Sequence, residues 1–508
     1  MIKKTTSSKE IKNFTPIRNF IWPIHAFELK KFLPMSLMMF FVLFNYTILR
    51  NTKDALIVPS SGAEAIPFLK GFVILPMAFL FATLYAKMTT LISQKNIFYL
   101  GIIIFVLIFW IFNLYLYPNR ESLEPIADNI MALKIKLPWF KHLFSVWEHW
   151  VFAIFYLFAE LWGTIVLFLL FWRFANEITT TQEAKRFYPM FVFIAHFALI
   201  AAGGMSKYYC TLQGLYTADA DPCAHFLRLI NWTFNFSCLA IVCLFYWMNK
   251  NILSNPIYYQ PILSNARKKD NKIRMTFTES LKNIITSRYI ALITILVIGY
   301  GTSNNILGIM WKDQLKQQYP DTLSYSNFMG SFSFFTGITT IILIFFFKGI
   351  IPKFGWKTAA FITPIVLLIT GSTFFIFLLF GSKLLSLTLF MGITPLFATV
   401  LIGTTQQILS KSSKYSMFDP TKEMAYIPLD ENLKNKGKAT VDIIGHSFAK
   451  ASGGYIISIL LIITTGTLSD IAPILSLIVM SIIMVWISAV HKLNKEYSRL
   501  IKNKENIK

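Results

Sequence analysis

Long apolar segments recur along the whole chain, and short stretches rich in polar and charged residues separate them. An apolar helix of about 20 residues crosses about 30 Å of hydrocarbon, because each residue adds about 1.5 Å along the axis. Twelve segments of about this length can be recognised, and the pattern predicts an all-α integral membrane protein with twelve transmembrane helices. They lie near residues 33–58, 65–87, 96–117, 149–173, 187–205, 228–248, 289–311, 326–347, 358–380, 384–409, 440–464 and 471–490.

The composition leads to the same conclusion. Of the 508 residues, 55% are hydrophobic and 16% aromatic, which is more apolar surface than one water-soluble core can bury. The lipid bilayer is therefore the first partner that the sequence predicts.

The net charge of +23 is concentrated in three segments. Residues 1–31, 249–288 and 491–508 are rich in Lys and Arg, whereas the segments on the opposite side of the predicted membrane are balanced. The positive-inside rule places such segments in the cytoplasm. We therefore expect both termini and the central loop to be cytoplasmic, and we interpret the charge as a signal of topology rather than of nucleic-acid binding.

The basic central loop divides the chain into two sets of six predicted helices, residues 32–248 and 289–490. Two short strings recur in both sets. "NYTILRNTKDAL" places Asn45, Lys53, Asp54 and Leu56 opposite the Asn, Lys, Asp and Leu of "NNILGIMWKDQL", and "HFALIAAGG" matches "HSFAKASGG". A repeat of six helices is typical of major-facilitator-like carriers, which hold their substrate between two pseudo-symmetric halves.

Charged side chains inside an apolar segment are costly and usually face a cavity or a partner. Lys438, Asp442, His446 and Lys450 follow one another at four-residue steps. On an ideal helix each step turns by about 40°, so the four side chains share one face. We interpret this face as the wall of a wet, positively charged cavity. Lys450 could instead pair with an acid for structural reasons, Lys438 fits the membrane interface, and His446 fits either proton transfer or packing.

A second group of charges ends the first apolar segment, where Arg50, Lys53 and Asp54 precede "ALIVP". The helix is expected to continue past them, although Lys53 beside Asp54 also fits a solvated helix end. Glu160 is the only acid in its long apolar segment, and it could pair structurally or alternate between cavity lysines. Lysines that converge from several helices favour an anionic substrate with phosphate groups.

Few other motifs carry chemistry. The sequence lacks a P-loop and an HExxH metal motif. Cys210 and Cys223 fall in one predicted external loop, where they could pair in an oxidising compartment. A membrane-embedded transferase is a distant alternative, because the predicted external loops carry no paired carboxylate motif.

Several long strings resemble the ATP/ADP translocases of intracellular bacteria and plastids. They extend from "KKFLPMSLMMFFVLFNYTILRNTKD" through "AELWGTIVLFLLFWRFANEIT" to "KYSMFDPTKEMAYIPLD". The resemblance implies a secondary transporter rather than an enzyme. Such a transporter exchanges ATP and ADP, and we expect it in the inner membrane of a bacterium. It implies no metal or redox cofactor, and we expect a monomer to be functional.

The resemblance also implies roles for three residues: Lys53, Glu160 and Lys450 match charged positions that are functionally important in the family. We add Asp54, Asp442, His446, Arg50 and Asn45 as candidate substrate-binding residues. One position departs from the family pattern, because Gly308 stands where energy exchangers have a Glu. A carrier that imports a wider range of nucleotides, by net uptake or with protons, is therefore the alternative function.

Overall fold

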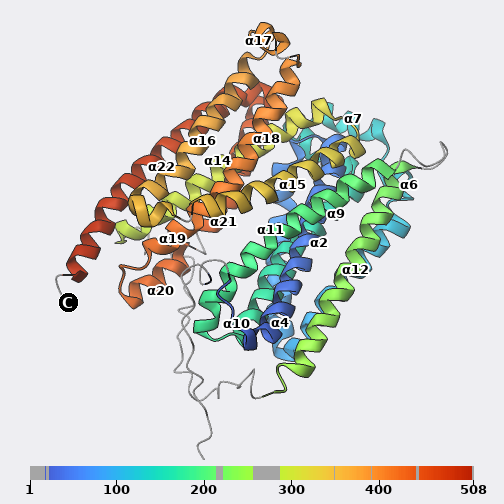
Figure 1. Ribbon diagram of the computed structural model, residues 1–508. Coiled ribbons are helices and arrows are strands. Elements are labelled where there is room, and N and C mark those ends of the chain that lie inside the picture. Colours follow the sequence, from blue (N-terminus) through green and yellow to red (C-terminus); the bar gives the residue numbers. More distant parts are fainter. Residues whose placement is uncertain are drawn as a thin grey trace, which may run out of the picture.

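A computed structural model describes residues 18, 22–212, 221–255, 286–347, 349–390, 392–441 and 445–505. In this part of the chain all regular secondary structure is helical. Figure 1 shows the helices gathered into two bundles, with the first half of the chain in blue and green and the second half in yellow to red.

The first half begins with the longest of its helices, α2, which continues well beyond the charged residues at Lys53 and Asp54. The prediction that this helix passes through them is therefore confirmed. The elements of the first half are η1 (Ala26–Glu28), α2 (Leu29–Ser61), α3 (Ala65–Phe68), η2 (Leu69–Ile74), α4 (Leu75–Leu91), α5 (Gln94–Ile111), η3 (Phe112–Leu116), α6 (Arg120–Leu123), α7 (Ala127–Lys136), η4 (Pro138–Phe140), α8 (Lys141–Glu148), α9 (Trp150–Trp162), η5 (Gly163–Phe171), α10 (Trp172–Ile178), α11 (Thr181–Thr211) and α12 (Pro222–Asn251).

The second half repeats this succession of long helices and ends in α22, which carries the C-terminal residues of the described chain. Its elements are α14 (Arg288–Gln318), α15 (Thr322–Phe347), α16 (Ile350–Phe380), α17 (Leu385–Phe390), α18 (Pro395–Ser413), η7 (Lys414–Phe418), α19 (Asp419–Ala425), α20 (Glu431–Thr440), α21 (His446–Thr464) and α22 (Leu468–Glu505).

Within the described residues, ten helices are long and apolar enough to cross a membrane, and they correspond to ten of the twelve predicted segments. The other two predicted segments contain α18 and α21. Helix α18 is less apolar than the ten because it contains polar residues such as Gln406, Gln407 and Ser410. These side chains are buried against neighbouring helices. Both helices pack against α14, so they occupy places inside the bundle.

Local sequence signals fix where several of the long helices begin. Thr180 and Glu183 form a capping box at the start of α11, in which the Thr hydroxyl accepts from the Glu183 amide and the Glu carboxylate from the Thr180 amide. Asp221 and Thr394 cap α12 and α18 in front of a proline at the first helical position, where the missing N–H is no loss. These caps start the helices at the membrane ends.

The buried apolar side chains form two cores. One contains residues of the first half, from Ile24 to Ile252. The other is built mainly from the second half, but it also includes side chains of the first half, among them Ala55, Ile66 and Tyr156. These residues belong to the last turns of α2, to α3 and to α9. The two halves are therefore joined by apolar packing at the end of the molecule where α2 ends.

Close helix contacts extend this junction. A methyl group added at Gly203 of α11 would lie 2.5 Å from the carbonyl oxygen of Gly330 in α15. One added at Gly453 of α21 would lie 2.9 Å from the Asn305 side chain in α14, and the next residue, Gly454, faces Pro67 of α3. Both glycine pairs belong to the repeated string found in the sequence. In each half that string brings a helix close to the other half.

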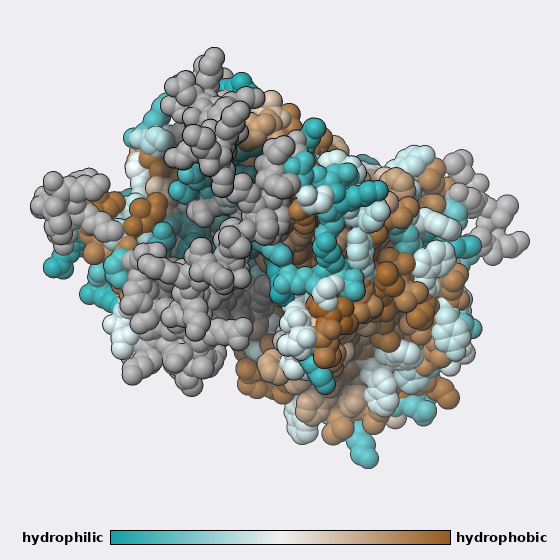
Figure 2. Space-filling view, turned by 90° about the horizontal axis from the view of Figure 1, so that it is seen from below, coloured by the Kyte–Doolittle hydropathy of each residue, from teal (hydrophilic) through white to brown (hydrophobic). Residues whose placement is uncertain are grey.

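The connections between helices strengthen the same junction. Lys141 Nζ donates to the Thr465 carbonyl oxygen, and the His142 ring lies 3.3 Å from the Gly466 carbonyl oxygen. The two bundles diverge toward the opposite end, where α4, α10 and the C terminus lie (Figure 1). Figure 2 shows that end, with hydrophobic residues along the flank and hydrophilic residues nearer the middle. Apolar packing, close helix contacts and hydrogen bonds thus join the two halves at the end where α2 ends, which we call the sealed end.

Candidate substrate site

Four charged side chains from three helices form a continuous chain of ion pairs near the sealed end. Lys53 Nζ of α2 lies 2.9 Å from Glu160 Oε1 of α9 and 3.0 Å from Asp54 Oδ1. The second oxygen of Asp54 lies 2.7 Å from Lys312 Nζ of α14. We call these residues the ion network. Asp54 links the two halves, because Lys53 belongs to the first and Lys312 to the second.

The ion network is buried and electrically balanced. The side chains of Lys53 and Asp54 are 2% and 3% exposed, and the Lys53 ammonium lies 3.6 Å from the centre of the Tyr156 ring. The Glu160 side chain is 26% exposed and the Lys312 side chain 16%, so these two residues are less deeply buried than Lys53 and Asp54. Two ammonium groups meet two carboxylates, which offsets the cost of removing each charge from water.

The internal repeat does not extend to these contacts. Asp313, the counterpart of Asp54, accepts from the Gln314 and Gln317 amides at 3.2 and 3.0 Å, and none of the described lysines lies at salt-bridge distance from it. Asn45 donates to Cys238 Sγ at 3.5 Å, so it faces α12 inside its own half. Asn45 thus lies apart from the other candidates. The repeat places equivalent residues on equivalent helices, but the helix packing brings both Lys53 and Lys312 to Asp54 and not to Asp313.

Two further cations lie beside the ion network, and the described residues provide neither with a carboxylate at salt-bridge distance. Arg50 lies one turn before Asp54 on α2, and its guanidinium is 5.8 Å from the Tyr46 ring. Lys411 is on α18, with its ammonium 4.5 Å from the centre of the Phe332 ring of α15. Arg50, Lys312 and Lys70 repel the Lys411 ammonium electrostatically, whereas Asp54 attracts it. This region carries an excess of positive charge.

Hydrogen bonds between helices hold Arg50 and Lys411 in place. Asn51, next to Arg50, donates to Ser333 Oγ at 2.9 Å and to the Met329 carbonyl oxygen at 3.3 Å, which fixes α2 against α15. Ser410, next to Lys411, donates to Asn304 Oδ1 of α14 at 2.7 Å. Both cations are half-buried, so their position depends on these neighbours.

Part of the predicted site lies outside the described residues. Asp442 is not among the described residues, and the side chains of His446 and Lys450 are not described either. The backbone places His446 and Lys450 in the first turns of α21. Lys438 is on α20 and pairs with Glu423 at 2.5 Å, away from the ion network. The predicted face of four charges thus stays a prediction.

The sequence analysis did not select Lys411, Tyr156 or the role of Lys312. A signal for Lys411 was present, because Thr404, Gln407 and Lys411 recur at helical spacing in an otherwise apolar segment. Such a polar face on a membrane helix indicates an interior wall. No comparable signal distinguishes Tyr156 from the other aromatic residues.

Gly308, the position that departs from the family pattern, lies in the same region. A methyl group added there would be 3.5 Å from Gln407 Nε2, which is an ordinary contact. Gly308 is one turn before Lys312, and Gln407 is one turn before Lys411. A side chain at position 308 would therefore point toward α18, on which Lys411 lies one turn beyond Gln407.

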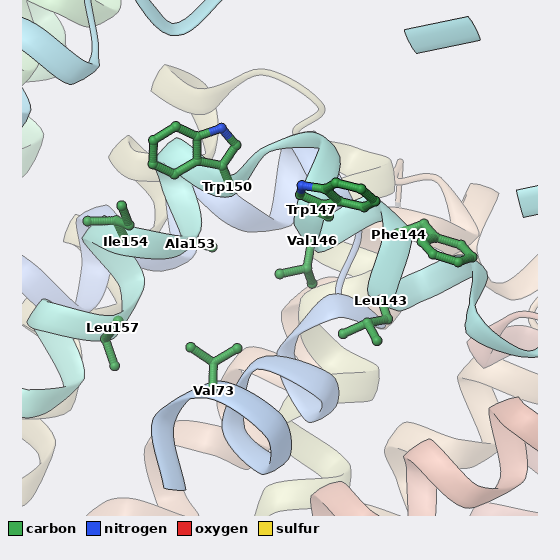
Figure 3. Close-up of a pocket in the computed structure, with 9 residues that line it drawn as sticks. All are labelled: Val73, Leu143, Phe144, Val146, Trp147, Trp150, Ala153, Ile154 and Leu157. Carbon is green, nitrogen blue, oxygen red and sulfur yellow. The ribbon is translucent and has the colours of Figure 1, made fainter. Parts of the chain in front are cut away.

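An apolar pocket of about 430 Å³ lies elsewhere, beneath the short helix α8. Figure 3 shows its lining, in which Val73 of η2 faces Leu157 of α9 while Trp147 and Trp150 close one side. Because it holds no charged side chain, it is separate from the ion network and does not fit an anionic substrate.

Two bundles joined at one end over an ion pair that links the halves form the architecture of a secondary transporter of the major-facilitator type. The fold is similar to the crystal structure of a bacterial homologue of the iron transporter ferroportin in an inward-facing state, with a TM-score of 0.58 at 12% identity over 92% of this chain and 99% of that chain. It is also similar to the nucleoside transporter NupG, with a TM-score of 0.51 at 12% identity over 91% and 99%.

The sequence identifies the family. The profile of the TLC ATP/ADP transporter family matches residues 7–497. "ADP,ATP carrier protein 1" of Chlamydia pneumoniae is 43% identical over 96% of this chain and 95% of its own length. The protein of the same name from Rickettsia bellii is 40% identical over 98% and 100%, and "ADP,ATP carrier protein 2, chloroplastic" of Arabidopsis thaliana is 42% identical over 96% and 77%.

The chain belongs to the TLC ATP/ADP transporter family. It is a multi-pass membrane protein and a secondary transporter, not an enzyme. The family resemblance and the major-facilitator-like fold expected from the sequence are both confirmed.

Proposed function

We propose that this protein exchanges ATP for ADP across the inner membrane of a bacterium by alternating access. The relatives named as ADP,ATP carriers support this activity at about 40% identity over nearly the whole chain. The observation that carries the mechanism is Asp54, which accepts from lysines of both halves. Such a link must break when the sealed end opens, and it can reform when the end closes.

The excess of Lys and Arg at both termini and in the central loop supports a cytoplasmic location for these segments. With this orientation the sealed end faces outward and the diverging end faces the cytoplasm. The conformation is then inward-facing, and a nucleotide would enter from the cytoplasmic side. A single chain contains the ion network and both glycine contacts, which supports a monomer as the functional unit.

Within this cycle, Lys53 and Lys450 bind phosphate and Glu160 competes for a lysine when the site is empty. The contact between Glu160 and Lys53 supports the second part, because the carboxylate lies where it can neutralise the Lys53 ammonium. A nucleotide whose phosphates replaced Glu160 would release it toward the cavity. Exchange would follow because the cations that Glu160 does not neutralise would lack phosphate in an empty site, and such a site moves reluctantly through the closed intermediate.

Uptake of radiolabelled ATP into proteoliposomes tests this function, with ADP preloaded in one set and buffer in the other. We expect uptake that depends strongly on preloaded ADP and is absent from protein-free liposomes. Chromatography of the recovered label should show unchanged ATP, since a carrier does not alter its substrate. Equal uptake with and without preload would contradict exchange.

Gly308 favours a second candidate, a carrier that imports a wider range of nucleotides. The carboxylate that energy exchangers hold at this position is missing, and Gln407 borders the space. This candidate predicts uptake of GTP, CTP, UTP or NAD without preload. The same liposomes, tested with each labelled compound in turn, distinguish the two.

A further inference from the structure

The ion network and its neighbourhood differ in charge balance. Lys53 and Lys312 are each held by a carboxylate, so neither offers a free ammonium group in this conformation. Arg50 and Lys411 lie beside them, and the described residues hold no carboxylate at salt-bridge distance from either. A half-buried cation without an anion is costly unless a ligand supplies one.

Arg50 and Lys411 also belong to opposite halves. Arg50 is on α2, whereas Lys411 is on α18, and both helices pack against α15. The bond between Asn51 and Ser333 fixes α2 beside α15, and α15 supplies the Phe332 ring beneath the Lys411 ammonium. Two like charges, one from each half, thus lie on helices that pack against α15.

We propose that the polyphosphate chain of the nucleotide binds between Arg50 and Lys411 and bridges the two halves. Guanidinium and ammonium groups both suit phosphate oxygens, and a chain of two or three phosphates carries enough charge to neutralise both cations. Tyr46 of α2 lies one turn before Arg50, and Tyr415 follows Lys411 by four residues, so aromatic rings border the same space. This proposal deepens the proposed function and rests on it.

The arrangement also gives a physical reason for obligatory loading. Without substrate, the positive charges of Arg50 and Lys411 repel each other, which opposes any movement that brings α2 and α18 closer. A bound polyphosphate turns this repulsion into attraction toward one shared anion. AMP, with a single phosphate, should bridge the halves poorly, and adenosine should not bridge them at all.

Binding measurements on the purified full-length protein in lipid nanodiscs test the proposal. The probes are ATP, inorganic tripolyphosphate and adenosine, and the variants are Arg50→Gln and Lys411→Gln. Each variant should weaken the binding of ATP and of tripolyphosphate by about tenfold or more, since a charge-assisted contact is lost. Lys411→Arg should keep most of the affinity, because the charge remains.

Lys414→Gln is the matched control. Lys414 lies less than one turn beyond Lys411, but its ammonium already pairs with Asp419 at 3.2 Å. Its loss should leave the binding of tripolyphosphate unchanged. Gel filtration and the thermal unfolding midpoint of each variant show whether it is folded before binding is compared.

The outcomes separate this proposal from the proposed function. If the wild type exchanges ATP and ADP but Lys411→Gln and Arg50→Gln bind tripolyphosphate as tightly as the wild type does, the bridge is wrong and the exchange activity stands. If the wild type neither binds nor transports nucleotides, the proposed function fails with it. Tenfold weaker binding in both folded variants, with the control unchanged, supports the bridge.

Discussion

Two neighbouring groups of charged side chains differ in how their buried charges are neutralised. The ion network pairs Lys53 and Lys312 with Asp54 and Glu160, and its inner members are almost completely buried. In the second group, Arg50 lies one turn before Asp54 and Lys411 lies on α18; each has an aromatic ring beside it and, among the described residues, no carboxylate at salt-bridge distance. A balanced network can hold two halves together without a ligand. An unbalanced pair needs an anion from outside.

The difference assigns a role to each group. Because the ion network satisfies its own charges in this conformation, it is suited to closing one end of the carrier. Because the second group does not, it is suited to binding the polyphosphate in this same conformation, before Glu160 yields Lys53 to phosphate. Four predictions test this division, beginning with the largest expected effect.

Asp54→Asn should have the largest effect. The substitution leaves Lys53 with Glu160 alone and Lys312 without a carboxylate, and breaking a buried ion pair costs about 3–5 kcal/mol. We expect a lower thermal unfolding midpoint in detergent and loss of ATP/ADP exchange in proteoliposomes. Asp313→Asn is the matched control, because the counterpart acid accepts only from Gln314 and Gln317 in the described structure. If both variants had the same unfolding midpoint and the same exchange activity, Asp54 would not be the residue that links the two halves.

The comparison of Asp54 with Asp313 also shows how far the sequence leads. The repeat, the two sets of helices and the candidates Lys53, Asp54 and Glu160 could be predicted, because charges in apolar segments and a constant offset are visible in one dimension. That Asp54 pairs with both Lys53 and Lys312 could not be predicted from the sequence. It depends on how α2 and α14 are rotated about their axes, and this rotation follows from side-chain packing across the junction.

Lys411 illustrates a different limit. A lysine near the end of a predicted membrane segment usually reaches the polar interface, so its position in the sequence favours an exposed role. The Phe332 ring and the Ser410 to Asn304 hydrogen bond place it inside the bundle instead. Polar residues that follow helical spacing through α18 are the signal that outweighs the end position.

Glu160→Gln should have a smaller effect than Asp54→Asn. Lys53 keeps Asp54 at 3.0 Å and the Tyr156 ring at 3.6 Å, so only one of its charged contacts is lost. We expect a destabilisation of about 1.5–3 kcal/mol, typical of a hydrogen bond to a charged group. Chemical denaturation followed by tryptophan fluorescence measures it. A loss equal to that of Asp54→Asn would mean that the network is not centred on Asp54.

Gly203→Ala tests the seal without changing any charge. Its methyl group would lie 2.5 Å from the Gly330 carbonyl oxygen and 2.6 Å from the Phe334 nitrogen, so α11 and α15 must move apart. Overpacking of this kind costs about 1–3 kcal/mol, and the closed end should open more often. Labelling of a cysteine introduced near this junction should become faster, with slower exchange.

Gly204→Ala is the control for this substitution. The added methyl group would lie 3.9 Å from Phe334 Cδ2, an ordinary contact, so labelling and exchange should match the wild type. Faster labelling in both variants would show that any added bulk opens the end. The seal would then not depend on the backbone approach at Gly203.

Gly308→Glu should have the smallest effect and bears most directly on the comparison. The first side-chain atom of the new residue would meet Gln407 at 3.5 Å, an ordinary contact, one turn along α14 from Lys312 and one turn along α18 from Lys411. The added carboxylate would reduce the excess positive charge of the region, and it would compete with phosphate for Lys411. We expect ATP and tripolyphosphate to bind several-fold more weakly, within about 1.4 kcal/mol. Gly308→Gln adds similar bulk without the charge and should bind both probes as the wild type does. If Glu and Gln weaken binding equally, bulk rather than charge matters at this position, and the excess positive charge is not what attracts the substrate.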